Sequence, residues 1–114
     1  MTLTDFSNRL KEKPETIAFE DTMAVVEANY DFTPTTFKNG ETVNEAGQNS
    51  GSCKLFAFTQ LQDLSQEETL ACFGQYYRND VLNYPEGTDH QNIRNFMKYG
   101  WNGIAFEGKA LVPK

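Results

Sequence analysis

Basic residues and long apolar runs are scarce in this sequence, and each shortage removes a class of function. Ten Lys and Arg residues stand against sixteen Asp and Glu residues, which leaves a formal charge of −6. A negative chain repels phosphate groups, and no run of Lys or Arg offsets this locally, so neither nucleic acid nor an anionic membrane surface is an expected partner. No segment approaches the roughly 18 apolar residues that a membrane-spanning helix needs.

Cysteine and histidine are also scarce, with Cys53, Cys72 and His90 as the only members of these types. Small secreted disulfide scaffolds usually carry more cysteines, so both thiols are expected to be reduced and buried. No pair of these residues has the spacing of zinc ligands, and we therefore expect no metal site and no cofactor. The N-terminal residues lack an apolar signal core, which indicates a soluble, cytoplasmic protein.

The composition that remains is globular and rich in aromatic residues. Hydrophobic residues make up 39% of the 114, and they include nine Phe, five Tyr and one Trp. This length corresponds to one domain, residues 1–114, with a single core that buries roughly 65% of the unfolded surface. Apolar spacing predicts about five helices packed with a small antiparallel sheet, which is an α+β fold.

Capping signals and a proline place the helices of the N-terminal part. Thr2 followed by Asp5 indicates the start of a helix over residues 3–12. Pro14 suits the first turn of a second helix, because its missing N–H needs no partner there. These two helices are expected to follow one another directly.

Three more helices are predicted further along the chain. Residues 53–64 are apolar on most faces, which predicts a central, buried helix. Ser65 begins a capping box, and the helix after it is expected to run as far as Pro85. Asp89 is expected to cap a shorter helix that ends near Gly100.

A β-hairpin is predicted at Asn39-Gly40, because both residues tolerate the positive φ of a type I′ turn. A two-residue loop at this point would place Lys38 opposite Glu41, a favourable pair of charges. The predicted strands are short and lie at 35–38, 41–44, 104–106 and 111–112.

The segment NEAGQNSGSCK, residues 44–54, places glycines and neutral amides in front of the apolar helix. It fails the phosphate-loop pattern, since only three residues separate Gly47 from Gly51. The leading hypothesis is a binding site for a small polar ligand or a protein partner, formed by this segment and the turn at 86–92. The candidate ligand-binding residues are Asn44, Gly47, Gln48, Asn49, Gly51, Ser52, Asp89 and Asn92.

A thiol-dependent enzyme is the alternative hypothesis. If Ser50 or Ser52 is the N-cap, Cys53 lies in a first helical turn, where free N–H groups and the helix dipole stabilise a thiolate. His90 follows the Asp89 cap at the start of another helix and is the candidate base. Cys53 and His90 are therefore the candidate catalytic residues. The competing interpretation is a core cysteine and a surface histidine.

Three longer stretches resemble the HopJ type III effector family, namely YDFTPTTFKNGETVNEAGQNSGSCKLFAF, TLACFGQYYR and PEGTDHQNIRNFMKYGW. The resemblance extends over nearly the whole chain. It implies a small single-domain bacterial protein that a type III secretion system delivers into a host cell, which is a third hypothesis for function. It carries over no catalytic or binding residue. The capped helix expected at 3–12 differs from the loose N-terminal segments of exported effectors and favours retention in the producing cell.

Overall fold

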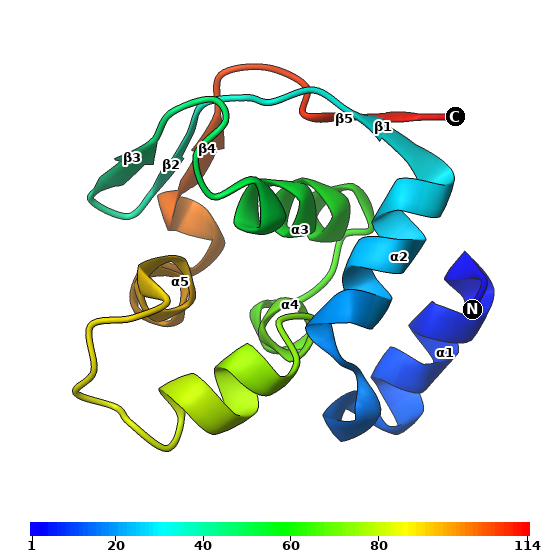
Figure 1. Cartoon of the computed structure of the whole chain (residues 1–114), viewed down its shortest axis with the longest axis horizontal. Coiled ribbons are helices and arrows are strands. Elements are labelled where there is room, and N and C mark those ends of the chain that lie inside the picture. Colours follow the sequence, from blue (N-terminus) through cyan, green and yellow to red (C-terminus); the bar gives the residue numbers. More distant parts are fainter.

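Five α-helices and two small antiparallel sheets make up the computed structural model, which describes residues 1–114 (Figure 1). The α-helices are α1 (Leu3–Glu12), α2 (Phe19–Asn29), α3 (Ser50–Leu61), α4 (Gln66–Ala71) and α5 (Gln91–Tyr99). The strands are β1 (Tyr30–Phe32), β2 (Phe37–Asn39), β3 (Thr42–Asn44), β4 (Ile104–Phe106) and β5 (Leu111–Pro113). Two short 3₁₀ helices, η1 (Pro14–Thr16) and η3 (Gly100–Gly103), and a π-helix, η2 (Tyr76–Val81), complete the chain. The predicted α+β class is confirmed.

The helix α3 lies at the centre of the molecule, between α2, α4 and the β2–β3 hairpin (Figure 1). Leu55, Phe56 and Phe58 on this helix are at most 1% exposed. The Phe56 ring has its centroid 5.0 Å from that of Phe96 and 5.4 Å from that of Phe73. Aromatic pairs of this kind each add about 0.5–1.5 kcal/mol beyond the burial of area. The predicted central helix is confirmed.

The hairpin is present, but its predicted register is wrong by one residue. Its two-residue loop is Gly40-Glu41, and Lys38 pairs with Val43 and not with Glu41. Gly40 has a φ of +63° at the first loop position, where a type II′ turn requires glycine. Asn39 is the last residue of β2 and is completely buried, so it belongs to the sheet and not to the turn.

The three strands of the hairpin sheet run in the order β3-β2-β4, and β1 pairs with β5 in a separate two-stranded sheet. The strands predicted at 104–106 and 111–112 are thus confirmed as β4 and β5. No helix of the protein combines the length and the apolar character that crossing a membrane requires.

The start of α1 is as predicted, whereas the second helix begins later than predicted. Thr2 and Asp5 form a complete capping box at α1. Pro14 begins only the short η1, and the chain then becomes extended at Ile17, which is fully buried. The backbone N–H of Ala18 donates to Asp21 Oδ2 at 3.0 Å, and α2 follows. The extended step to α2 allows Ile17 to reach the core.

The helix expected to run from Ser65 to Pro85 is in fact broken in two. Ser65 forms the predicted capping box, but α4 ends at Ala71 and Gly74 has a φ of +62°. A Cβ at Gly74 would lie 2.4 Å from the backbone nitrogen of Phe19, so only glycine allows the two backbones to cross here. The chain continues as η2, in which the N–H of Leu82 donates to the carbonyl of Tyr77, the i→i+5 pattern of a π-helix.

Candidate functional site

One cavity of about 360 Å³ opens where the starts of α3 and α5 meet the strand β3. Its polar lining residues are Thr42, Asn44, Asn49, Ser52, His90, Gln91 and Asn92. Its apolar wall consists of Phe19, Phe73, Tyr76 and Ile93, with Gly51 at the helix start. No Lys, Arg, Asp or Glu lines the cavity. A few convergent polar groups beside an aromatic wall are typical of a site for a small molecule.

Five of the eight predicted ligand-binding residues line this cavity, namely Asn44, Asn49, Gly51, Ser52 and Asn92. The other three have different surroundings. Gly47 is an exposed turn residue with a φ of +91°. Gln48 Oε1 accepts a hydrogen bond from the N–H of Glu45, and Asp89 binds Arg94. The structure thus brings together the two polar segments that are 48 residues apart at Asn44 and Asn92.

A network of asparagine amides joins these two segments beside the cavity. Asn44 Nδ2 donates to Asn92 Oδ1 at 3.2 Å, and Asn92 Nδ2 donates to Asn44 Oδ1 at 3.1 Å. Asn39 Nδ2 donates to both the backbone oxygen and Oδ1 of Asn92, at 2.8 and 2.9 Å. Asn49 Nδ2 donates to Asn44 Oδ1 at 2.7 Å. The network fixes the hairpin and α3 against the start of α5.

Both helix starts at the cavity have N-caps other than those predicted. The N-cap of α3 is Asn49 and not Ser50 or Ser52, and the N-cap of α5 is His90 and not Asp89. Asn49 and His90 both have a φ of 51°, and neither forms a side-chain capping bond. The first N–H groups of each helix therefore lack a side-chain acceptor, and the partial positive charge of both helix ends lies at the cavity.

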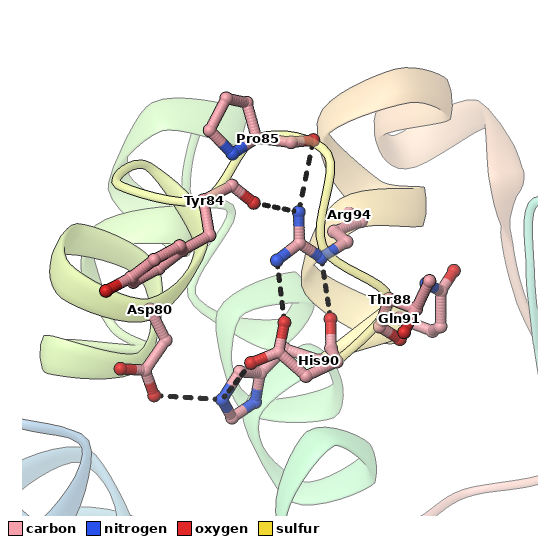
Figure 2. Close-up of polar contacts among 8 residues, drawn as sticks. Asp80, Tyr84, Pro85, Thr88, His90, Gln91 and Arg94 are labelled. Carbon is pink, nitrogen blue, oxygen red and sulfur yellow. Dashed lines mark hydrogen bonds and ion pairs between the residues drawn. The ribbon is translucent and has the colours of Figure 1, made fainter.

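His90 is held by residues of η2 (Figure 2). Its Nε2 lies 3.0 Å from Asp80 Oδ2 and 3.9 Å from Asp89 Oδ2. Its ring stacks on Tyr76 with a centroid distance of 5.1 Å and an interplanar angle of 26°. Nδ1 has no partner within the protein. One ring nitrogen is therefore fixed by a carboxylate, and the other remains free.

Arg94 holds the loop that leads into His90 (Figure 2). Its guanidinium donates to the backbone oxygens of Tyr84 at 2.8 Å and Asp89 at 2.6 Å, and to Asp89 Oδ1 at 2.7 Å. The hydrogen bond from Arg94 also lowers the pKa of the Asp89 carboxyl group. The carboxylate of Asp89 thus orders the loop, while its neighbour His90 lines the cavity.

Cys53 lies away from the cavity, inside the core. Its side chain does not line the cavity, and the residue is 2% exposed. Its thiol donates to the carbonyl of Thr35 at 3.5 Å. Because α3 begins at Ser50, Cys53 occupies the fourth helical position, and burial raises the pKa of the thiol. No hydrogen bond joins Cys53 to His90, so this geometry gives the thiol-enzyme hypothesis no support.

Several cavity residues have no signal in the local sequence. Phe19 and Phe73 stack on one another with centroids 6.3 Å apart, and they reach the cavity only because the chain crosses itself at Gly74. Asp80 binds His90 without lining the cavity itself, and it is four residues from Tyr76, a spacing that a helix places on one side. That spacing, together with the proximity of His90 in the sequence, is the one signal from which Asp80 could have been found.

Comparison with known proteins places the chain in a family. The family model described as HopJ type III effector protein matches residues 3–111. A solved structure described as the crystal structure of unknown function protein VPA0580 has a TM-score of 0.98 and 60% sequence identity, and the match covers 100% of this chain and 95% of that chain. No curated protein matches. The resemblance found in the sequence is confirmed: the chain belongs to the HopJ type III effector protein family.

Proposed function

We propose that the protein binds a small polar ligand in the cavity between α3, β3 and α5. The observation that carries the proposal is the convergence of two helix starts and several amides on one cavity of about 360 Å³. This volume lies within the range of about 300–1,000 Å³ that is usual for small-molecule sites. A small ligand is favoured over a protein partner because the polar groups line a hollow.

The lining limits the chemistry of the ligand. Phe19, Phe73 and Tyr76 offer a wall for a planar, apolar part. The Ser52 hydroxyl and Asn49 Oδ1 have no protein partner and are available for hydrogen bonds. The helix ends disfavour a cation, and no carboxylate in the lining offsets this. The best fit is a planar compound that is neutral or carries one negative charge.

Gly51→Ala tests this proposal by filling the cavity. A Cβ at Gly51 would lie 3.0 Å from Phe19 Cζ, at the end of a side chain that can adjust, so the fold is expected to persist. Alanine is also a better helix former than glycine, by about 1 kcal/mol. Gly108→Ala is the matched control, since its Cβ would meet only Thr35 Cγ2, at 3.8 Å.

The measurement is a titration of the ¹⁵N-labelled protein with benzoate, benzamide and 4-nitrophenol, followed by amide chemical shifts. In the natural protein and in Gly108→Ala, shifts are expected at residues 49–52 and 90–93. In Gly51→Ala the affinity is expected to fall about fivefold to 150-fold, since overpacking such a site costs about 1–3 kcal/mol. Shifts spread over other surfaces, or equal affinities for the three proteins, would reject this cavity as the site.

We also propose, from family membership, that the protein acts in a host cell after export through a type III secretion system. The support is the description of the matching family as a type III effector. The test is a fusion of residues 1–20 to a reporter enzyme in a bacterium with a working secretion apparatus. Appearance of the reporter in the host cell supports export, and its retention in the producing cell argues against it.

A further inference from the structure

We propose that His90 takes a proton from the ligand in the cavity, and that this ligand is a small planar compound with an acidic hydroxyl group, such as a phenol or an enol. The inference rests on the proposed function and gives it a ligand class and a proton-transfer residue. Its basis is the contact of His90 with Asp80, which Figure 2 shows, together with the stacking of the His90 ring on Tyr76 at the edge of the cavity.

Asp80 fixes which nitrogen of His90 is free. A carboxylate only accepts hydrogen bonds, so the Nε2 that lies 3.0 Å from Asp80 Oδ2 carries the proton of a neutral ring. Nδ1 then has a lone pair, and no group of the protein uses it. His90 lines the cavity, so a bound hydroxyl group is the natural partner for this nitrogen.

The surroundings of the ring suit the charge that the transfer creates. The O–H bond of the ligand breaks, its electron pair stays on the ligand oxygen, and the proton forms the N–H bond at Nδ1. The resulting imidazolium lies next to Asp80 and 3.9 Å from Asp89 Oδ2. Arg94, on α5, binds the other oxygen of Asp89, so Asp80 is the only carboxylate near the ring without a cation of its own. The new anion on the ligand lies near the starts of α3 and α5, where negative charge is favoured.

The π-helix provides both groups that hold the ring. Tyr76 stacks on His90 and Asp80 binds its Nε2, and both belong to η2. Tyr76 also lines the cavity, so its ring and the imidazole form one continuous surface against which a planar ligand would pack. π-Helices are rare and often occur at functional sites, which agrees with a positioning role for this one.

4-Nitrophenol is a direct probe, because its phenol and phenolate forms have different absorbance spectra. At a pH where the free compound is mostly neutral, we expect the ratio of phenolate to phenol to rise about tenfold on binding. An adjacent opposite charge shifts such an equilibrium by about one to three pH units.

Two variants test the roles of His90 and Asp80. His90→Asn keeps a residue that tolerates the left-handed φ of 51°, and Asp80→Asn keeps the size of the side chain. Both variants are expected to leave bound 4-nitrophenol as the neutral phenol. Asp80→Asn, whose side chain does not line the cavity, is expected to bind it within about threefold of the natural affinity, whereas His90→Asn loses a contact to the ligand and is expected to bind it more weakly.

The outcomes separate this inference from the proposed function. Binding at residues 49–52 and 90–93 with the spectrum of neutral phenol overturns the proton transfer and leaves the binding site in place. The absence of binding at these residues overturns both. A phenolate spectrum that persists in His90→Asn shows that another group takes the proton and overturns the role of His90. A phenolate spectrum that is lost in Asp80→Asn while affinity is kept supports Asp80 as the positioning residue, since a merely structural role would change the affinity.

Discussion

At the scale of single residues, burial decides the chemistry of the two cysteines. Cys53 is 2% exposed and Cys72 is fully buried, and neither forms a disulfide. Burial raises the pKa of both thiols, that of Cys72 to about 12. A thiol is a nucleophile only as the thiolate, so both residues are expected to be inert at neutral pH. The predicted burial of both cysteines is confirmed.

The raised pKa of Cys72 predicts how stability depends on pH. The folded protein holds this proton up to about pH 12, whereas the unfolded chain releases it near its ordinary value of 9.0. The stabilisation is therefore complete below pH 9 and is lost as the pH rises towards 12. The free energy of unfolding should fall with pH more steeply than in Cys72→Ala, by about 1 kcal/mol per pH unit. Urea unfolding of both proteins across this range makes the comparison, and equal slopes would contradict it.

Local signals in the sequence were sufficient wherever a residue interacts with its neighbours. Thr2 and Ser65 form their capping boxes within three residues, and both were predicted. Asn39 was predicted in a turn, but its amide binds Asn92, which is 53 residues away. Asp89 was predicted as a cap, but its carboxylate binds Arg94. These two side chains could not be assigned because several local and distant partners compete for the same polar atoms.

At the scale of elements, the asparagine amides attach the β2–β3 hairpin to α5. Asn39 and Asn44 lie on the strands, Asn92 lies on the helix, and all three are buried. Buried amides without partners cost about 1–3 kcal/mol each, so the pairing of these side chains fixes how the elements dock. One buried oxygen of the network, Asn39 Oδ1, has no partner.

Asn92→Ala should separate the hairpin from the helix. The substitution removes the Oδ1 that accepts from Asn39 and Asn44 and the Nδ2 that donates to Asn44, whereas the backbone oxygen of residue 92 still accepts from Asn39. Because the amide of Asn44 stays buried with fewer partners, we expect a loss of about 2–4 kcal/mol in the free energy of unfolding. Asn102→Ala, at an exposed position, should change it by less than about 0.5 kcal/mol. Urea denaturation of both variants gives the comparison. A loss for Asn92→Ala no larger than that of the control would show that the network contributes no stability.

The existence of most elements could be predicted, but their ends could not. The central helix α3 and the strands β4 and β5 lie where apolar patterning placed them. The break between α4 and η2 was missed because apolar spacing continues through it, and only the contact of Gly74 with the chain at Phe19 explains it. Contacts between distant segments decide such boundaries, and a single sequence does not contain them.

At the scale of the whole molecule, the aromatic wall of the cavity depends on the close contact between the backbone at Gly74 and the backbone at Phe19. The backbone at Gly74 passes so close to Ala18 and Phe19 that no side chain fits between them. This crossing brings Phe19, from the N-terminal part, to a cavity that is otherwise formed by residues 42–93. The meeting of the two polar segments was predicted from sequence, whereas the place of Phe19 and Phe73 in the wall was not, because it depends on the global path of the chain.

Gly74→Ala should therefore harm both the fold and the cavity. Its Cβ would lie 2.4–2.8 Å from backbone atoms of Ala18 and Phe19, at a φ of +62°. We expect a loss of about 3 kcal/mol or more, from the strained φ and the overlap together. Gly108→Ala should stay within about 1 kcal/mol of the natural protein. Thermal unfolding measures both, and a near-normal Gly74→Ala protein would mean that the two backbones can separate at little cost.

The burial of Asn39 also has a consequence for chemical ageing. Asparagine followed by glycine deamidates when the glycine nitrogen attacks the side-chain carbonyl carbon and closes a succinimide ring. In the folded protein the N–H of Gly40 donates to the carbonyl of Gly103 at 2.9 Å, and the Asn39 amide is fixed to Asn92. Ring closure then requires local opening, so the rate of deamidation should follow the fraction of molecules in which this region is open, and it should rise in Asn92→Ala. The extent of deamidation at Asn39, measured by mass spectrometry of stored samples, would therefore report how much of the protein is locally open around Asn39 and Gly40.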